Sequence, residues 1–348
     1  MKAALMTSFD GALPVETVDD PACPRDGAIV AVRACGVCRS DHHAWKGADP
    51  DVSLPHVMGH EFAGEVIETG PECHAFAPGD RVTAPFILGC GTCPDCRAGS
   101  SSVCANQQVI GFTAWGAFAE RVAIPHADFN LVHLPPGVAY TAAAGMGCRV
   151  TTAFRAVVDR AQLRPGEWLA VHGCGGVGLS AVMIGAALGA RVLAIDIAPR
   201  ALGMARDLGA NDTLDATAGG VGEAVREITG GGAHVSIEAL GITATFENSL
   251  RCLRPLGRHV QVGMPVGAHA SPPLPLLELV YARQLSLLGT RGIGADRFAA
   301  LFEMIAAGRL SPERLVTQTI PLSGAATALR AMDRFQTHGV TVIDQLDC

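Results

Sequence analysis

The sequence of 348 residues has little charge: Asp, Glu, Lys and Arg make up 17% of it, whereas hydrophobic residues make up 49%. A disordered polymer needs the opposite balance, so that class is excluded. The 41 glycines follow no period of three, which excludes a collagen. Lys and Arg number 26 against 33 Asp and Glu, for a net charge of −7. The chain thus lacks the basic surplus with which proteins bind nucleic acids, and we expect no nucleic-acid partner.

The chain also lacks an apolar run at its start that is long enough for a signal peptide. The charge-free stretch 168–190 is long enough to cross a bilayer, but it contains six glycines. A strand, a glycine turn and a buried helix explain it better, so we expect no membrane partner. These absences predict a cytoplasmic protein. There, the 12 cysteines would more often bind metal or take part in catalysis than form disulfides.

The length predicts about two domains, and the composition divides the chain accordingly. Residues 1–150 are rich in Pro, Gly, His and Cys, with short β-branched runs such as 28–32 and 65–68, which indicates an irregular β-rich domain. Residues 151–289 alternate between strand and helix patterns, which predicts βαβ units around a parallel sheet. The predicted strands are 169–171, 191–197, 234–239, 258–262 and 286–288, and the predicted helices are 176–188, 199–208, 221–228 and 243–252.

The end of the chain is too short for a domain of its own. It begins with helical spacing from residue 295 and ends with a strand-like run at 340–343. We therefore expect residues 290–348 to pack on the first domain. The sequence shows no long internal repeat of the kind that solenoids and propellers have.

The strongest local motif is a set of four cysteines. Two residues separate Cys90 from Cys93 and Cys93 from Cys96, and seven separate Cys96 from Cys104. Such gaps let the backbone curl back so that four thiolates surround one tetrahedral Zn²⁺. Glycines and a proline in this segment indicate a loop rather than four ordinary core cysteines. Four thiolates leave no position for a substrate, so the predicted zinc is structural.

A second set of possible metal ligands is dispersed along the chain. Cys38 begins the segment Cys-Arg-Ser-Asp-His-His, His60 lies in Gly-His-Glu, and Cys148 lies in Gly-Cys-Arg. Together, two thiolates and an imidazole would leave a fourth zinc position open, as catalytic zinc sites do. Singly, a cysteine is more often a small core residue and a histidine a satisfied polar group. The spacing does not establish that the three residues meet, so both interpretations stay open.

The third motif is Gly-Cys-Gly-Gly-Val-Gly at 173–178, between a predicted strand and a predicted helix. In this context Gly173 permits a tight turn, Gly175 lets the backbone approach a pyrophosphate, and Gly178 lets the helix pack against the strand. The free N–H groups at the start of the helix would face the phosphate. The alternative is a glycine-rich turn that binds no ligand.

An acidic residue stands where a dinucleotide site needs one. Asp196 lies at the end of the predicted strand 191–197, which follows the glycine motif and its helix. Its carboxylate would accept hydrogen bonds from ribose hydroxyls and repel a 2′-phosphate, which favours NAD over NADP. Arg200 lies close in the sequence and weakens that preference.

Together these motifs resemble a zinc-dependent alcohol dehydrogenase of the medium-chain dehydrogenase/reductase superfamily. The similarity runs nearly end to end, through GVCRSDHH, GHE, the four-cysteine segment, GCRVTTAF and GCGGVG with its acid. The resemblance implies an α/β fold with two domains. Residues 151–289 would form a Rossmann NAD-binding domain with a doubly wound parallel sheet. Residues 1–150 and 290–348 would form a β-rich GroES-like catalytic domain, with a structural zinc lobe at 89–105.

The resemblance also implies the reaction, which is the reversible oxidation of a primary or secondary alcohol to an aldehyde or ketone by hydride transfer to NAD. It implies two Zn²⁺ ions per chain. The catalytic zinc would be bound by Cys38, His60 and Cys148, and the structural zinc by Cys90, Cys93, Cys96 and Cys104.

The resemblance implies further roles for residues beside the catalytic zinc. Glu61 would lie behind the metal and assist ligand exchange, and Asp41 would orient the ligand imidazole. Ser40 would touch the substrate oxygen, and His43 would pass its proton toward solvent. Trp45 and Phe86 resemble the bulky walls of a pocket for small alcohols.

The cofactor contacts are also implied by the resemblance. Arg39 would contact the pyrophosphate, and Val262 and Met264 would lie beside the nicotinamide. The remaining implied contacts come from the glycine turn and the region of its acid: Gly173, Gly175, Gly176, Val177, Gly178, Asp196 and Arg200.

Several alternatives remain. A formaldehyde or polyol dehydrogenase would share zinc and NAD, although polyol enzymes of this family commonly have a carboxylate where this chain has Cys148. A zinc-free quinone or enoyl reductase would lack both cysteine sets, and a non-catalytic NAD-binding relative would not need the relay groups. The resemblance further implies a homo-oligomer, either a homotetramer or a homodimer. The cysteines without a role, which we expect to be reduced, are Cys23, Cys35, Cys73, Cys174, Cys252 and Cys348.

Overall fold

The computed structural model describes residues 1–333 and 338–346, so Cys348 lies outside the described residues. Contacts between residues divide the chain into two compact units. Unit 1 comprises Met1–Thr151, Gly292–Ala307 and Ser311–Cys348. Unit 2 comprises Thr152–Arg291 and Gly308–Leu310. Each unit has its own sheets.

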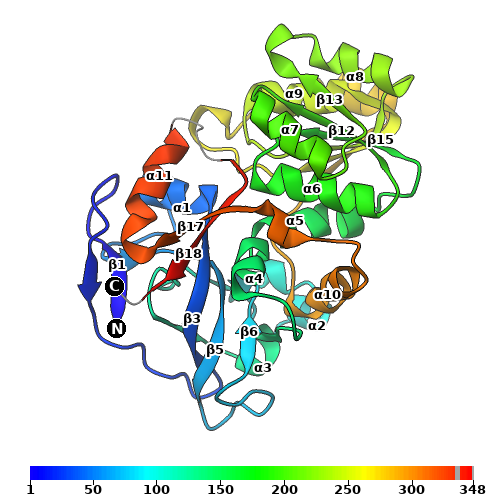
Figure 1. The fold of residues 1–348 in the computed structure, drawn as a ribbon. Coiled ribbons are helices and arrows are strands. Elements are labelled where there is room, and N and C mark those ends of the chain that lie inside the picture. Colours follow the sequence, from blue (N-terminus) through cyan, green and yellow to red (C-terminus); the bar gives the residue numbers. More distant parts are fainter. Residues whose placement is uncertain (334–337, 347–348) are drawn as a thin grey trace. The chain divides into compact units, whose positions relative to one another are not determined.

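The main sheet of unit 1 has seven strands and is built around β3 (Ala28–Val37). Nearly every residue of β3 is buried, as expected for a strand covered on both faces. It pairs antiparallel with β5 (Glu61–Thr69), β9 (Arg121–Ile124) and β18 (Val340–Gln345), and β5 runs beside it in Figure 1. The predicted strand runs at 28–32, 65–68 and 340–343 are therefore confirmed. The sheet is completed by β6 (Arg81–Thr83), β10 (Val132–His133) and β17 (Val316–Pro321).

Smaller elements complete unit 1. The helix predicted from residue 295 is confirmed as α10 (Phe298–Ala306), whereas α11 (Ala325–Asp333) and β17 were not predicted. The minor strands are β1 (Lys2–Met6), β2 (Val15–Thr17), β4 (His56–Val57), β7 (Ile87–Leu88) and β8 (Gln108–Val109). The other α-helices are α1 (Arg39–Trp45), α2 (Pro94–Arg97), α3 (Ala127–Asn130), α4 (Tyr140–Met146) and α5 (Arg149–Phe154), of which α5 continues into unit 2.

Unit 2 is a six-stranded parallel sheet in the order β13-β12-β11-β14-β15-β16, and helices connect most of its strands (Figure 1). Numbered within the unit, this order is 3-2-1-4-5-6, the doubly wound order of dinucleotide-binding folds. The strands are β11 (Trp168–His172), β12 (Arg191–Asp196), β13 (Asp212–Asp215), β14 (Ala233–Glu238), β15 (Leu253–Gln261) and β16 (Ser286–Gly289). The helices between them are α6 (Gly176–Ala187), α7 (Pro199–Asp207), α8 (Val221–Thr229) and α9 (Thr243–Arg251).

The five predicted strands and four predicted helices of this region are confirmed, with two differences. β13 was not predicted, because its sequence Asp-Thr-Leu-Asp has a single apolar residue and it lies at the edge of the sheet. β15 begins at Leu253 rather than at 258, and its pairing with β14 shifts register between Ala233 and Val235. This irregularity accommodates Pro255, because a proline within a strand cannot donate to the ladder and is tolerated at bulges.

The charge-free stretch 168–190 folds as β11, a glycine turn and α6. Its residues are mostly buried within the parallel sheet and the helix that follows. Across residues 1–333 and 338–346, no helix combines the length and apolar character required to cross a membrane.

Candidate active site and metal centres

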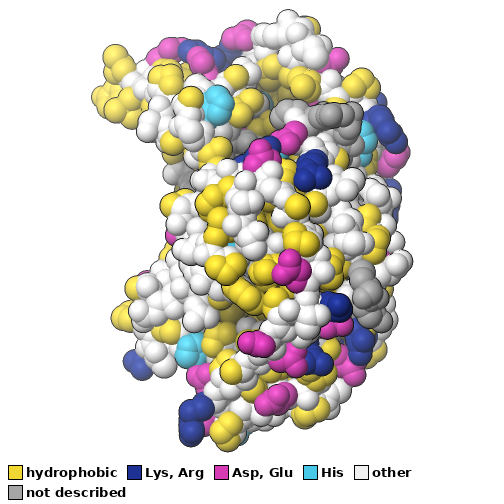
Figure 2. Space-filling view, turned by 90° about the vertical axis from the view of Figure 1, so that its left-hand side faces the viewer, with side chains coloured by type: hydrophobic (Ala, Val, Ile, Leu, Met, Phe, Trp, Pro, Cys, Tyr) yellow, Lys and Arg dark blue, Asp and Glu magenta, His cyan; other side chains and the backbone are white. Residues whose placement is uncertain are grey.

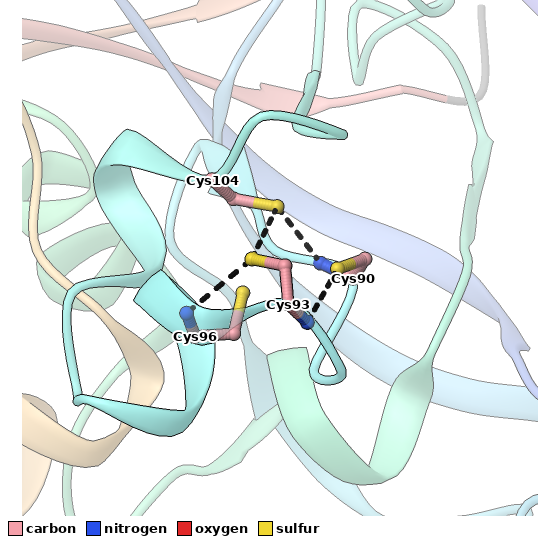
Figure 3. Close-up of side chains that lie close together, drawn as sticks. All are labelled: Cys90, Cys93, Cys96 and Cys104. Carbon is pink, nitrogen blue, oxygen red and sulfur yellow. Dashed lines mark hydrogen bonds between the residues drawn. The ribbon is translucent and has the colours of Figure 1, made fainter.

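The four-cysteine segment forms a compact loop after β7, and its sulfur atoms point toward one another (Figure 3). All four sulfur atoms lie within 4.8 Å of one another. Cys93 Sγ and Cys104 Sγ are 3.7 Å apart. A tetrahedral zinc with bonds of about 2.3 Å sets its sulfur ligands about 3.8 Å apart, so the geometry fits this ion.

Backbone amides of the same loop point at these sulfur atoms. The N–H groups of Cys93 and Cys96 donate to the sulfur of the preceding cysteine, each at 3.4 Å, and that of Asn106 donates to Cys104 Sγ at 3.3 Å. Such donors stabilise thiolates. Hydrogen bonds from Thr92 and Cys93 lower the pKa of Cys90 to about 5. Burial raises the pKa of Cys96 to about 12, so this thiol needs a cation to ionise at neutral pH.

The dispersed ligand set also comes together, within unit 1. Cys38 follows β3 and precedes α1, His60 immediately precedes β5, and Cys148 lies between α4 and α5. The donor atoms of Cys38, His60, Cys148 and Glu61 all lie within 4.8 Å of one another, and all four residues are buried. We refer to these four residues as the Cys38 cluster. The fold therefore places side chains from distant parts of the sequence, 38 to 148, around one point.

Asp41 determines how His60 faces this cluster. Its Oδ1 lies 2.8 Å from His60 Nδ1, and its Oδ2 accepts a hydrogen bond from the backbone N–H of Cys38 at 2.8 Å. Burial opposes a charged imidazole, but Asp41 raises the pKa of His60 well above its ordinary value. The other ring nitrogen, Nε2, is buried and has no hydrogen-bond partner among the described residues. A buried nitrogen without a partner beside two thiols fits a metal ion.

The two thiols of the Cys38 cluster also interact with each other. Their contact lowers the pKa of Cys38 well below its ordinary value and raises that of Cys148. The two shifts have opposite signs, so burial and mutual contact oppose ionisation of both thiols together. A divalent cation would favour the ionised form of both and bind the two sulfur atoms as thiolates.

Glu61 is fully buried beside Arg149, for which no role was predicted. Glu61 Oε2 lies 2.9 Å from Arg149 Nη1, and the Arg149 side chain is 6% exposed. Burial raises the pKa of Glu61 to about 7, although the charge of Arg149 opposes this shift. One signal could have identified the arginine, because it is the only charged residue between 140 and 154. A lone charge in so apolar a helical segment predicts a buried partner.

The predicted relay residues lie on α1 beside Cys38. Ser40 Oγ is 3.8 Å from Cys38 Sγ. His43 is half-buried, and its Nδ1 lacks a hydrogen-bond partner within the part of the chain that the structure describes. Burial and the neighbouring His42 lower the pKa of His43, so the ring is neutral near pH 7 and able to accept a proton. Arg39 is partly buried and donates from Nη1 to the carbonyl of Met332 at 3.0 Å.

The two predicted pocket walls have different surroundings. The ring of Phe86 lies edge-on to His60, with centroids 5.6 Å apart, and so it contacts the Cys38 cluster. The ring of Phe112 lies 5.2 Å from His60 and was not predicted. Trp45 is 1% exposed and donates from Nε1 to the carbonyl of Gly11 at 3.0 Å. Its described contacts are those of a core residue, and its role as a pocket wall stays a prediction.

In unit 2 the glycine turn has the shape that a phosphate site requires. Gly173 has φ +92°, which favours glycine. A Cβ on Gly178 would lie 1.7 Å from the carbonyl oxygen of Gly173, so only glycine lets α6 approach the turn. A Cβ on Gly175 would meet no described atom within 4 Å. Gly176 and Val177 begin α6, whose first N–H groups are available to an anion.

Asp196 ends β12 beside this turn. Its carboxylate accepts hydrogen bonds from the backbone N–H of Cys174 at 2.6 Å and of Ala198 at 2.9 Å. Arg200, in the first turn of α7, is exposed. Val262, which directly follows β15, is half-buried, and Met264 is exposed. β11, β12 and β15 are parallel members of one sheet, so these residues follow its carboxyl edge, where ligands bind in such folds.

Known proteins share both units of this chain. Residues 24–136 match the alcohol dehydrogenase GroES-like domain, and residues 176–307 match the zinc-binding dehydrogenase family. The chain is 31% identical to an alcohol dehydrogenase of Geobacillus stearothermophilus, over 99% of either protein. It is 29% identical to an NAD-dependent alcohol dehydrogenase of Sulfurisphaera tokodaii, again over 99% of each.

A solved structure shows the same likeness. The alcohol dehydrogenase from Thermus sp. ATN1 superimposes with a TM-score of 0.90 at 34% identity, covering 99% of this chain and 100% of that one. The similarity in sequence and structure extends over nearly the full length of this chain, and both family models match within it. The chain therefore belongs to the zinc-binding alcohol dehydrogenases of the medium-chain dehydrogenase/reductase superfamily.

Proposed function

We propose that this enzyme catalyses the reversible oxidation of a primary or secondary alcohol to an aldehyde or ketone, with zinc and NAD as cofactors. The observation that carries the proposal is the convergence of Cys38, His60 and Cys148 on one buried point. The imidazole nitrogen that faces this point has no protein partner among the described residues. Two sulfur ligands and one nitrogen ligand leave room for a substrate, as in catalytic zinc sites.

Bound zinc supplies a Lewis acid that lowers the pKa of an alcohol, and bound NAD supplies the hydride acceptor. The chain itself supplies proton transfer and orientation. Ser40, beside Cys38, accepts the hydroxyl proton of the substrate, and the neutral ring of His43 takes it toward solvent. Asp41 holds the ring of His60 and the backbone of Cys38, and so it fixes two ligands at once. Phe86 packs against the imidazole and excludes water from that side.

Unit 2 binds the cofactor in this proposal. The backbone N–H groups of Gly175, Gly176 and Val177 would donate hydrogen bonds to the pyrophosphate. The carboxylate of Asp196 would accept hydrogen bonds from the ribose hydroxyls. The carboxylate supports NAD over NADP, because a 2′-phosphate would meet a negative charge. From the family resemblance, Arg39 would contact the pyrophosphate, and Val262 and Met264 would lie beside the nicotinamide. Cys90, Cys93, Cys96 and Cys104 hold a second, structural zinc.

We also propose that the enzyme is a homo-oligomer, a homotetramer or a homodimer. β16 is an edge strand of the parallel sheet, and Leu287 on it is exposed. The preceding segment exposes Leu276, Leu277 and Tyr281, with Tyr281 76% exposed. An open strand edge beside exposed apolar side chains is suited to pairing with a second copy.

On the face shown in Figure 2, basic and acidic side chains are mixed and form no continuous basic surface.

A cytoplasmic location is part of the same proposal. The eleven cysteines among the described residues are all free, although several lie close together. Free thiols held in metal-binding geometry persist in a reducing compartment.

Metal analysis combined with an NAD⁺ reduction assay tests the proposed function. The purified enzyme should contain two zinc ions per chain and form NADH with simple primary or secondary alcohols in a panel that includes formaldehyde and polyols. Protein without metal would contradict the zinc assignment. Two zinc ions without turnover on any member of the panel would contradict the assigned reaction.

A further inference from the structure

Glu61 is the member of the Cys38 cluster that a three-ligand zinc site does not explain. One of its carboxylate oxygens lies within 4.8 Å of the donor atoms of Cys38, His60 and Cys148. The carboxylate is therefore close enough to act as a fourth ligand. A ligand in that position would close the site to substrate, because a catalytic zinc keeps one position open.

The contacts of Glu61 draw it toward the segment that follows Cys148. Its Oε1 accepts hydrogen bonds from the backbone N–H of Cys148 at 3.0 Å and of Arg149 at 3.3 Å. Its Oε2 lies 2.9 Å from Arg149 Nη1, as an ion pair without the angles of a hydrogen bond. Arg149 thus supplies the counter-charge, while Oε2 keeps a lone pair with no hydrogen-bond donor among the described residues.

Arg149 is itself anchored beside the first ligand. Its Nη2 donates to the carbonyl of Val37, the residue before Cys38. Its backbone directly follows Cys148, and its guanidinium contacts Glu61, which follows His60. One buried residue is therefore adjacent to all three ligands, because its side chain contacts the neighbours of Cys38 and His60 and its backbone directly follows Cys148. This position allows it to control where the carboxylate lies.

The recess around Glu61 is shaped by two glycines. A Cβ on Gly36 would lie 2.3 Å from Glu61 Oε2, and one on Gly147 would lie 2.7 Å from Glu61 Cα. Larger side chains at these positions would push the carboxylate out of the recess. The backbone thus leaves the space that the carboxylate needs to sit against Arg149.

We propose that Arg149 is a positioning residue that holds the Glu61 carboxylate out of the metal coordination sphere and keeps the fourth position open to substrate. The inference rests on the proposed function, because it requires a metal bound by Cys38, His60 and Cys148. A buried carboxylate without its counter-charge is strongly destabilised, and a metal held by Cys38, His60 and Cys148 would be a cation within its reach. Without Arg149, Glu61 binds the metal and competes with the substrate.

The test uses the enzyme with cobalt(II) in place of zinc, because the visible absorption of cobalt(II) reports its coordination. Azide is the probe of the open position, and the four-cysteine site has no position to bind it. The variants are Arg149→Met, Glu61→Gln and the double variant. Arg258→Met is the matched control, because it removes a partly buried arginine that is paired with Glu167 in unit 2.

We expect Arg149→Met to weaken azide binding by about tenfold or more and to change the cobalt spectrum before azide is added. The double variant, which carries no carboxylate, should return to within about threefold of the wild-type azide affinity. Arg258→Met should leave both properties unchanged. Unchanged azide affinity in Arg149→Met would overturn the proposal, as would a loss that persists in the double variant.

Two further outcomes remain decisive. If Arg149→Met fails to fold, Arg149→Lys replaces it, because an ammonium keeps the charge but loses the fork that reaches both Glu61 and Val37. Azide affinity in that variant should fall by about threefold and recover with Glu61→Gln, and no change would overturn the proposal. If the wild-type enzyme takes up one cobalt and gives no azide response, the proposed function itself has failed.

Discussion

The four-cysteine loop and the Cys38 cluster both bring possible ligands within 4.8 Å of one another, but from different distances along the chain. The loop ligands all lie in the short segment 90–104, whereas those of the Cys38 cluster are spread over 38–148. The first site is therefore encoded by local spacing. The second depends on β3, β5 and the segment between α4 and α5 folding together.

The two sites also differ in what surrounds their ligands. In the loop, backbone N–H groups point at the sulfur atoms. In the Cys38 cluster, side chains surround the ligands, with Asp41 at His60 and Arg149 at Glu61. Backbone donors are fixed by the turn, which is suited to a permanent metal. Charged side chains can adjust to a changing ligand, which is suited to catalysis.

Cys38→Ser should produce the largest effect on activity. It removes one thiolate from a three-ligand site, and the zinc contribution of several kcal/mol to the transition state corresponds to a loss of about a thousandfold or more in kcat/KM. The variant should contain one zinc per chain and still bind NADH, because the glycine turn lies in unit 2. Turnover like that of the wild type with one remaining zinc would break the comparison between the two sites.

Cys93→Ser should have the reverse profile. The zinc of the loop contributes to folding rather than to the reaction, so its loss should lower the midpoint of thermal unfolding by about 5–10 °C. The turnover of the folded fraction should change by less than about threefold, because the substitution leaves the Cys38 cluster intact. Calorimetry and kinetics on the same sample measure both. A thousandfold loss of turnover in a fully folded variant would show that the loop acts in catalysis.

The same contrast explains what could be predicted from the sequence. The four-cysteine loop and the glycine turn depend on neighbours within a few residues, so spacing identifies them. The strands of unit 2 were predictable where apolar runs bury them, but β13 has one apolar residue and was missed. In unit 1, β17 was missed because Val-Thr-Gln-Thr-Ile-Pro is largely exposed and contains no continuous apolar run.

The parts of the site that could not be predicted depend on long-range packing. Nothing in the local sequence shows that the carbonyl of Val37 and the carboxylate of Glu61 meet one guanidinium, because three separate segments meet there. The proximity of Cys38, His60 and Cys148 was implied by resemblance alone. Asp41 could be assigned by resemblance, but its bond to the backbone of Cys38 follows from the start of α1.

The buried histidines allow the comparison to be extended to pH. His60 has a carboxylate partner, whereas His172 and His259 in unit 2 are buried and have none among the described residues. Burial lowers the pKa of His172 to about 3, with a further contribution from His259, and burial lowers the pKa of His259 to about 4. In the unfolded chain a histidine titrates near pH 6.5. Both rings therefore stay neutral in the folded protein while the unfolded chain binds protons.

The sign of the pH effect follows from these depressed pKa values. Their contribution to stability is fully present above pH 6.5 and is lost as the pH falls from 6.5 toward 4 and 3. At pH 5.5 each histidine reduces the free energy of unfolding by about 1.4 kcal/mol relative to pH 7.5. Between pH 7.5 and pH 5.5, the free energy of unfolding of His172→Gln should therefore fall by about 1.4 kcal/mol less than that of the wild type. Urea unfolding at both pH values measures this difference. A variant with the full pH dependence of the wild type would show that His172 is protonated in the folded protein, and the contrast with His60 would then rest on His259 alone.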